Sequence, residues 1–338
     1  TASDPRAYSR RRFSACGCAP KSLRLTSPAA HFMTTNKVAL VGCGRWGRNL
    51  GRCLARLGAL DSVCDASPDA ADALAAEHAV PVRSLDDLVA DDSVTGVALA
   101  TPAVTHAQVT ERCLTAGKHV FVEKPMAVSV ADAEANRDLA ERAGVTLMIG
   151  HLLQYHAAFI QLRQMVKEGA IGSLRYVYSN RLAFGQIRSE ENSLWSFGPH
   201  DISMILSLMG ELPNTISAVG AALVQPAVAD VTTTHLTFPE QRYAHVFVSW
   251  LHPYKEQKLV VVGESGMLEF NDQRDWADKV LHYPHQVDWR GDMPTACSAE
   301  VEAIPVEPSE PLMDEMRHFL ECIDTGRRPR TDAEEGIA

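Results

Sequence analysis

A carboxylate and an amine stand next to each other at the end of a short apolar run, as Glu123 and Lys124. Residues 120–122, Val-Phe-Val, are typical of a buried parallel strand, and Pro125 follows the pair. Ligands of open α/β sheets bind beyond the carboxyl ends of the strands, so we expect Lys124 to face a pocket. The alternative is a surface lysine and proline after a strand, with no part in chemistry.

A phosphate-binding pattern lies nearer the start of the chain. Residues 42–47 read Gly-Cys-Gly-Arg-Trp-Gly, after a predicted buried strand at 37–41 and before a helical pattern. In G-x-G-x-x-G the first Gly allows a tight turn, the second lets a pyrophosphate approach, and the third lets helix and strand pack closely. Free N–H groups at the helix N-terminus attract the phosphate. The candidate dinucleotide contacts are Gly42, Gly44, Arg45, Trp46 and Gly47.

An acid, Asp65, ends the next predicted strand, about 20 residues beyond Gly44. An acid in this place accepts hydrogen bonds from the adenosine ribose hydroxyls and repels a 2′-phosphate, which favours NAD over NADP. The alternative is a cap for the helix predicted over 67–78, a role that Ser67 could fill instead.

The candidate base is a histidine near a predicted helix start. Pro199 suits the first helical position, which places His200 in the first turn. The positive end of the helix dipole there lowers the pKa of an imidazole and favours its neutral, proton-accepting form. The alternative is a core or capping histidine, and we keep that interpretation for His106, His151 and His156.

The elements that must position these groups follow two patterns. Residues 36–150 alternate strands and helices, which predicts a doubly wound parallel sheet of the Rossmann type. Residues 151–310 hold long strands with few helices between them, which predicts an α/β domain with an open, mostly antiparallel sheet. One sheet face should cover a helix, and the other should be exposed or serve association in a homodimer or homotetramer.

The second part of the chain is expected to contain six strands, a loop and a late helix. The strands are predicted at 174–184, 215–224, 231–238, 243–250, 258–262 and 267–270. Residues 272–311, with several prolines and acids, are expected to be a loop, and the helix is predicted over 312–323.

The composition is that of a globular chain of about two domains, with 338 residues, 46% of them hydrophobic and 22% charged. The net charge of −10 argues against a general nucleic-acid or membrane-surface binder. No apolar run approaches the roughly 18 residues of a membrane span. The eight cysteines form neither a disulfide framework nor a metal site, which fits a reducing cytoplasm.

The first 32 residues differ from the rest, with six Lys or Arg residues and one acid. Residues 9–13 resemble a twin-arginine export signal, but Lys21 and Arg24 interrupt the apolar core that such a signal needs. Met33 directly precedes the polar lead into the first strand and could be the natural start. Residues 1–35 are therefore expected to be a disordered or non-native extension.

Taken together, these motifs make the chain resemble a known family. The fingerprint, the Thr101-Pro102 turn, residues 119–125 and the histidine of the second part resemble the glucose–fructose oxidoreductase/inositol dehydrogenase (Gfo/Idh/MocA) family, from about Lys37 to the end. Residues 44–49, 178–182 and 190–200 further resemble the branch that oxidises the 3-hydroxyl of UDP-N-acetylhexosamines or their uronates.

The resemblance implies an NAD-dependent sugar dehydrogenase. The nicotinamide would lie near Thr101, Glu123 and Lys124, with Pro102 and His106 as further cofactor contacts. In hydride transfer between the cofactor and a sugar carbon, His200 would take the hydroxyl proton, and Lys124 would stabilise the negative charge on that oxygen. The peptide bond before Pro125 is expected to be cis. The candidate substrate contacts are Arg181, Arg188, Asn192, Trp195 and His200.

The chain departs from the family pattern at two points. Ser196 stands four residues before the histidine, where many members carry Asp, so we expect a lysine–histidine pair rather than a Lys-Asp-His set. Many members also continue beyond this C-terminus, so residues 311–338, expected to return toward the Rossmann domain, could be truncated. Arg188 could meet a substrate phosphate or be a solvated loop charge.

Three functions stay open at this stage. The leading one is dehydrogenation of a nucleotide-linked amino sugar, and the second is dehydrogenation of a free sugar or a cyclitol. The third is a sensor or scaffold that binds NAD without turnover, as expected if Lys124 or His200 failed to reach the nicotinamide pocket.

Overall fold

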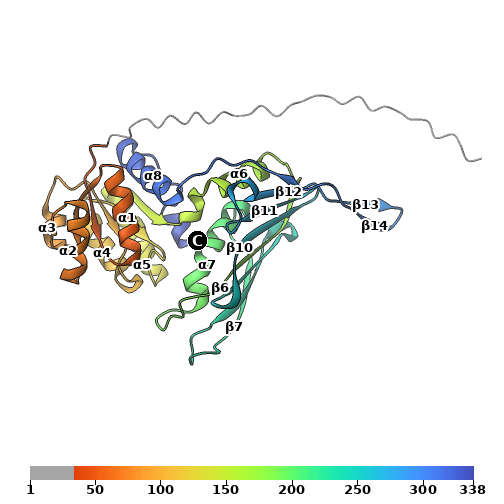
Figure 1. The fold of residues 1–338 in the computed structure, drawn as a ribbon, viewed down its shortest axis with the longest axis horizontal. Helices are drawn as coiled ribbons and strands as arrows, with labels where there is room; N and C mark the ends of the chain where they lie inside the picture. The colour runs from red at the N-terminus through yellow and green to blue at the C-terminus, as the bar shows by residue number, and fades with distance from the viewer. Residues whose placement is uncertain (1–33) are drawn as a thin grey trace, which may run out of the picture. The chain divides into compact units, whose positions relative to one another are not determined.

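The computed structural model describes residues 34–338. Residues 1–33 of the expected N-terminal extension, with the basic segment, Cys16, Cys18 and Met33, lie outside these residues. Within the described part, the first sheet along the chain consists of β1 (Val38–Val41), β2 (Leu60–Cys64), β3 (Gly96–Leu99), β4 (His119–Glu123) and β5 (Leu147–Gly150) (Figure 1).

These five strands are all parallel and lie in the order β2-β1-β3-β4-β5. Every residue of β1, β3 and β5 is buried, which explains their uninterrupted apolar sequences. Val82 forms a single parallel bridge to Val63 of β2, on the edge of β2 that faces away from β1. Counted as a strand, this bridge gives the order 3-2-1-4-5-6, the arrangement of dinucleotide-binding folds. The predicted Rossmann sheet is confirmed.

Five helices accompany the strands: α1 (Arg45–Arg56), α2 (Pro68–His78), α3 (Leu85–Ala90), α4 (Ala103–Thr115) and α5 (Val130–Ala143). Ser67, Ser84 and Ser129 cap α2, α3 and α5, and each accepts a hydrogen bond from a backbone N–H three residues later. Gly144 ends α5 in the left-handed conformation.

The second sheet has eight strands in the order β15-β12-β11-β10-β6-β9-β8-β7. Every neighbouring pair is antiparallel except β6 with β9, so the predicted open, mostly antiparallel sheet is confirmed. Its strands are β6 (Leu174–Phe184), β7 (Thr215–Ala221), β8 (Val231–Thr237), β9 (Tyr243–Ser249), β10 (Leu251–Gly263), β11 (Met267–Asn271), β12 (Val280–Tyr283) and β15 (Glu302–Ala303).

Two helices, α6 (Ala157–Lys167) and α7 (Ser193–Met209), cover one face of this sheet. Phe159 and Ile205 of these helices share a fully buried core with Val246 of the sheet. On the opposite face, side chains such as Tyr176 and His245 remain partly exposed. The alternation of buried and exposed residues along β6 and β9 follows from these two environments.

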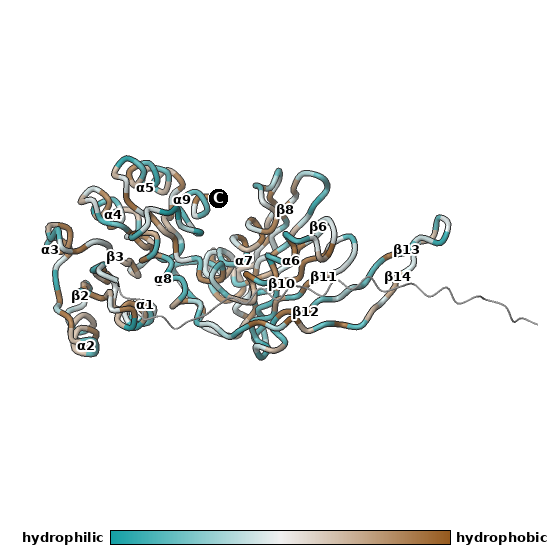
Figure 2. The backbone as a smooth tube through the Cα atoms, turned by 90° about the horizontal axis from the view of Figure 1, so that it is seen from above, coloured by the Kyte–Doolittle hydropathy of each residue, from teal (hydrophilic) through white to brown (hydrophobic). Residues whose placement is uncertain are grey.

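The stretch from 272 to 311 was expected to be a loop, and that expectation is wrong. It contains β12 and β15 and the separate hairpin of β13 (Gln286–Arg290) and β14 (Met293–Cys297). All five residues of β13 are exposed, so its sequence lacks the alternation that marks a half-buried strand. Figures 1 and 2 both show the hairpin pointing away from the eight-stranded sheet.

The end of the chain packs on the first sheet and its helices. The helix α8 (Pro311–Thr325) lies on α1 and on the short helix η1 (Leu152–Tyr155), and Phe319 contacts Phe121 of β4 with ring centroids 6.0 Å apart. The helix α9 (Ala333–Ile337) lies beside α5 and β5 (Figure 2). Of the helices in residues 34–338, none has the length and apolar character to cross a membrane.

Candidate active site

The three glycines of the fingerprint have three different surroundings. Gly42 has a φ of +100°, and a Cβ there would lie 2.6 Å from the carbonyl oxygen of Ala100. A Cβ on Gly47 would lie 1.8 Å from the carbonyl oxygen of Gly42. A Cβ on Gly44 would meet nothing within 4 Å, so the backbone there borders open space. The turn, the close packing and the open approach that a dinucleotide needs are thus all present.

The N-terminus of α1 is free to receive an anion. Gly44 is its N-cap residue, no side chain caps the helix, and no acidic residue lies in its first turn. Arg45 is exposed at this end. The unpaired N–H groups and the helix dipole therefore suit a phosphate, and the residues fit a nicotinamide dinucleotide.

Asp65 connects the fingerprint loop to the end of β2. Its carboxylate accepts hydrogen bonds from the backbone N–H of Cys43 at 2.6 Å and of Ser67 at 2.7 Å. Ser67, and not Asp65, caps α2, as the sequence allowed. The Asp65 carboxylate is therefore held rigidly beside the dinucleotide cradle, where the adenosine ribose lies in folds of this type.

Glu123 is a buried carboxyl group at the end of β4 and accepts a hydrogen bond from the indole N–H of Trp46. Burial raises the pKa of Glu123 to about 7, against the opposing influence of Trp46 and of the Lys124 charge. Gly150 leaves room for this group, since a Cβ there would come within 2.9 Å of the carboxyl carbon. The Trp46–Glu123 bond thus joins the fingerprint helix to the end of β4.

The ammonium group of Lys124 donates a hydrogen bond to the carbonyl oxygen of Ser196 at 2.9 Å. Burial lowers the pKa of Lys124, and the carboxylates of Glu123 and Glu191 partly oppose this. Of its three N–H bonds, one is used within the described residues and two remain for a ligand. Ser196, which replaces the family's Asp, therefore contributes its backbone to the site. The peptide bond between Lys124 and Pro125 is cis, as the resemblance implied.

The predicted helix start at Pro199 is wrong. The helix α7 begins at Ser193, and Asn192 caps it by accepting a hydrogen bond from the N–H of Trp195 at 3.0 Å. Pro199 lies inside the helix, so His200 is in its third turn and not beside its positive end. The helix-dipole argument for a neutral His200 therefore fails, because the effect fades beyond the first turn.

His200 is nevertheless held neutral, for a different reason. Burial lowers its pKa well below the ordinary value, and the positive charges of Lys124 and Arg181, with His151, lower it further. Nδ1 of His200 is buried without a hydrogen-bond partner in the protein. Nε2 is therefore the ring nitrogen that can serve a ligand. Lys124 contacts the carbonyl oxygen of Ser196, which lies on α7 four residues, or about one turn, before His200.

Arg181 forms a buried ion pair with Asp201, and Ser179 donates a second hydrogen bond to the same carboxylate. Arg181 is only 9% exposed, and its pair with Asp201 joins β6 to α7. A contact of Arg181 with the substrate stays a prediction.

The remaining predicted substrate contacts lie around the first turn of α7. Arg188 pairs with Glu191 at 3.1 Å, and Trp195 is 50% exposed. Glu191 and Arg188 both influence the pKa of Lys124, so this loop borders the lysine. Asn192 is committed to the helix cap.

The loop after β3 lies next to the end of β4. The carbonyl of Pro102 accepts a hydrogen bond from the N–H of Thr105 at 2.9 Å, and the hydroxyl of Thr105 donates to that of Thr101 at 2.8 Å. His106 is buried, and its ring nitrogens lie 2.8 Å from the carbonyl oxygen of Thr101 and 2.7 Å from that of Pro125. This fits the packed-histidine alternative, with His106 supporting both loops from behind.

One acidic group near His200, Glu335, had no signal in the sequence. His151, taken for a packed histidine, lies edge-on to the ring of His200, and Glu335 of α9 contacts it. His151 and Glu335 are 184 residues apart, so no local pattern could have connected them. Within residues 34–338, no group of three or more His, Cys, Asp or Glu side chains is arranged to hold a metal ion.

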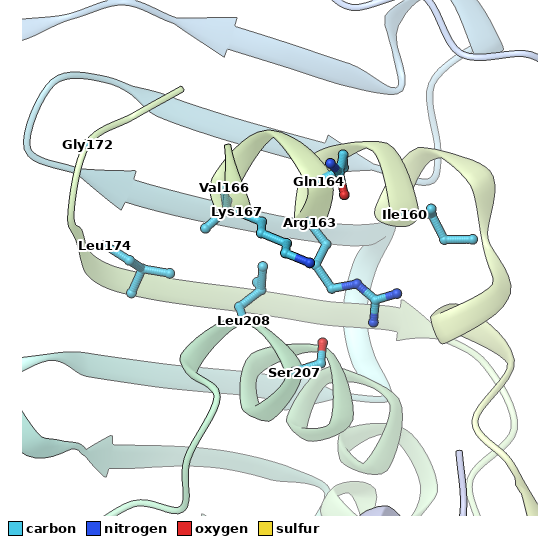
Figure 3. A pocket seen from close by; sticks show the side chains of 9 residues that line it. All are labelled: Ile160, Arg163, Gln164, Val166, Lys167, Gly172, Leu174, Ser207 and Leu208. Atoms are coloured by element: carbon cyan, nitrogen blue, oxygen red, sulfur yellow. The ribbon is translucent and has the colours of Figure 1, made fainter. Parts of the chain in front are cut away.

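One hollow in the described residues lies away from this site. It has a volume of about 570 Å³ and is formed by α6, the start of β6 and the end of α7, with Arg163, Lys167 and Ser207 among its lining residues (Figure 3). None of the predicted site residues lines it. We place the chemistry at the end of β4, where the ionisable groups meet, and not in this hollow.

An open dinucleotide cradle next to a lysine and a neutral histidine defines the class of nicotinamide-dependent oxidoreductases. Residues 36–151 match the family model described as "Oxidoreductase family, NAD-binding Rossmann fold", and residues 159–269 match the "GFO/IDH/MocA C-terminal domain". The chain belongs to the Gfo/Idh/MocA family of oxidoreductases and is an enzyme that uses NAD or NADP.

Several known proteins are similar to this chain. UDP-N-acetylglucosamine 3-dehydrogenase of Acidithiobacillus ferrooxidans is 28% identical over 86% of this chain and 90% of its own length. A solved structure of that enzyme superimposes with a TM-score of 0.79, at 26% identity, and covers 89% of this chain and 93% of its own. Myo-inositol dehydrogenase Hyg17 of Streptomyces leeuwenhoekii is 33% identical over 69% of this chain and 75% of its own length.

Proposed function

We propose that this enzyme uses NAD to oxidise a sugar hydroxyl, at C3 of a UDP-linked N-acetylhexosamine or its uronate. The observation that carries the proposal is the pairing of Lys124 with His200. An ammonium group with two unused N–H bonds lies close to an imidazole whose pKa is well below its ordinary value. These two groups are suited to hold one hydroxyl and to take its proton.

When bound, the nicotinamide would supply the hydride acceptor, and side chains of the protein accept the proton. His200, neutral near pH 7, accepts the proton of the sugar hydroxyl at Nε2. Lys124 donates a hydrogen bond to the same oxygen and stabilises its negative charge as the proton leaves. Ser196 holds the ammonium group in place through its carbonyl oxygen. In the reverse direction, His200 returns the proton to the oxygen.

The choice of NAD rests on Asp65. Its carboxylate is fixed by two backbone N–H groups beside the fingerprint loop. A negative charge in that place repels the 2′-phosphate of NADP and accepts hydrogen bonds from the ribose hydroxyls of NAD.

The choice of a UDP-linked sugar rests on the similar dehydrogenase of Acidithiobacillus ferrooxidans and on two side chains near α7. Trp195 is half exposed and offers a ring face to a sugar or a base. Arg188, bound on one side to Glu191, offers its remaining N–H groups to a phosphate. The second candidate is oxidation of a free sugar or an inositol, favoured by the similarity to Hyg17.

The test is NADH formation by the purified chain with UDP-N-acetylglucosamine, its uronate, free glucose and myo-inositol. We expect turnover with a UDP-sugar and none with the free compounds. Turnover with the free compounds alone would replace the proposed substrate by the second candidate. Binding of NAD without turnover on any of them would count against the proposed substrate and favour the sensor alternative.

A further inference from the structure

The segment after α8 brings a carboxylate to the back of the candidate site. Thr331 is joined to Ile149 of β5 by two hydrogen bonds: the N–H of Ile149 donates to the Thr331 carbonyl at 2.8 Å, and the Thr331 hydroxyl donates to the Ile149 carbonyl at 2.7 Å. The helix α9 starts two residues later and carries Glu335. This pairing with β5 places Glu335 beside His151, the first residue after that strand.

Both oxygens of Glu335 are engaged. One lies 2.5 Å from Nδ1 of His151, and the other accepts a hydrogen bond from the hydroxyl of Ser203. Ser203 lies on α7, about one turn beyond His200. Glu335 therefore links the end of β5 to the helix that carries the candidate base. Since a carboxylate accepts hydrogen bonds, it fixes the proton of His151 on Nδ1 and leaves Nε2 as an acceptor.

His200 has an unsatisfied nitrogen on the protein side. Its Nδ1 is buried without a partner, and its ring lies edge-on to His151, with centroids 6.5 Å apart and planes at 74°. A buried polar atom without a partner is costly, and in a native protein it calls for an explanation. His151 carries an acceptor nitrogen, and Glu335 contacts its other nitrogen. It is therefore the polar group available to accept a hydrogen bond from Nδ1 of His200.

We propose that Glu335, acting through His151, is a positioning residue for His200. When His200 takes the substrate proton at Nε2, its Nδ1–H carries part of the new positive charge. The Glu335 carboxylate, on the far side of the His151 ring, then stabilises that charge, as a carboxylate does behind the histidine of a catalytic triad. One proton moves from the hydroxyl to His200, and Glu335 neither gains nor loses one. This inference rests on the proposed role of His200 as the base.

Among the charged groups around His200 and His151, Glu335 is the one that compensates the positive charge of a protonated His200. Lys124, directly after β4, Arg181 of β6 and His151 all lower the pKa of His200 and so disfavour its protonated form. Glu315 of α8 is fully buried, and burial, with the nearby Glu123 and Glu335, raises its pKa well above the ordinary value and favours its uncharged form. Glu123, with its pKa near 7, is only partly ionised there.

The first experiment compares Glu335→Gln with Glu334→Gln. Glu334 lies on the same helix but is exposed and pairs with Arg137 at 3.2 Å, so it is a matched control. We expect Glu335→Gln to lower kcat by about 10- to 100-fold, with KM and the dissociation constant of NADH changed less than about twofold. The acid limb of the kcat profile should move to lower pH, because a protonated His200 has lost its negative partner. Glu335→Asp should restore part of the loss.

The second experiment repeats Glu335→Gln in a His200→Ala background. If Glu335 acts through His200, the second substitution should not lower the residual rate further. A wild-type kcat in Glu335→Gln, or an equal loss in both backgrounds, would overturn the inference. Should Glu335→Gln fail to fold, His151→Asn tests the same connection with the same criteria. Wild-type turnover in His200→Ala itself would instead overturn the proposed function, so the two failures are distinguishable.

Discussion

The substitution Glu123→Gln isolates how the titration of a buried acid at the end of β4 contributes to the unfolding free energy. The glutamine keeps the size of the side chain and an oxygen that can accept the hydrogen bond from Trp46. It removes the titration of a group whose pKa is raised from its ordinary value of 4.5 to about 7 by burial. Such a difference between folded and unfolded states corresponds to about 3 kcal/mol of unfolding free energy.

The sign of the effect follows from the raised pKa of Glu123. Below pH 4.5 the carboxyl is protonated in both states and contributes no pH dependence. Between pH 4.5 and about 7 the unfolded chain ionises while the folded protein keeps the proton, so stability falls as the pH rises. Above about pH 7 both states are ionised, and the full cost of about 3 kcal/mol is present. The Glu123→Gln variant lacks this contribution at every pH.

Urea unfolding at constant ionic strength measures the difference directly. The unfolding free energy of the wild type minus that of Glu123→Gln should fall by about 3 kcal/mol from about pH 4.5 to about pH 8. Glu111→Gln, on the exposed side of α4, is the control and should give a curve parallel to the wild type. A constant difference between the wild type and Glu123→Gln would refute the reasoning, because Glu123 would then titrate alike in both states.

Two further predictions concern the dinucleotide cradle. Gly44→Ala should leave the unfolding free energy unchanged but weaken NADH binding, because its Cβ enters the open space beside the backbone. Gly47→Ala should also destabilise the fold by at least about 1–3 kcal/mol, because its Cβ would overlap the Gly42 carbonyl. Denaturation and NADH fluorescence titration measure the two effects, and equal stability losses in the two variants would contradict this. Asp65→Asn should lower the ratio of kcat/KM for NAD to that for NADP by about tenfold, because a charge facing the 2′-phosphate is removed. An unchanged ratio would remove Asp65 from cofactor selection.

The elements that the sequence predicted well are those whose signals are local. The strands β1, β3 and β5 are buried along their whole length, so each appears as an apolar run, and the cap Ser67 lies directly before α2. The fingerprint and the Glu123-Lys124 pair are also local signals, since the residues of each are contiguous in sequence. Their positions at the strand ends follow from the parallel fold itself.

The elements that were missed depend on tertiary contacts. A proline often marks a helix start, but α7 begins six residues before Pro199, after the Asn192 cap, and keeps the proline in its interior. Burial of one face of α7 compensates for the proline. The strands β13 and β14 pair only with each other and bury little, so their sequence looks like a loop. The contact between Glu335 and His151 joins residues far apart in sequence, and only the packing of α9 on β5 brings them together.

The most direct test of the account measures turnover and cofactor binding in Lys124→Ala and His200→Ala. Each variant should lower kcat by about 100- to 10,000-fold with the preferred sugar, while the dissociation constant of NADH stays within a few-fold of the wild type. Lys167→Ala, in the hollow of Figure 3, is the control and should keep full activity. Near-normal turnover in either site variant would contradict the claim that an ammonium and a neutral imidazole at the end of β4 share the chemistry.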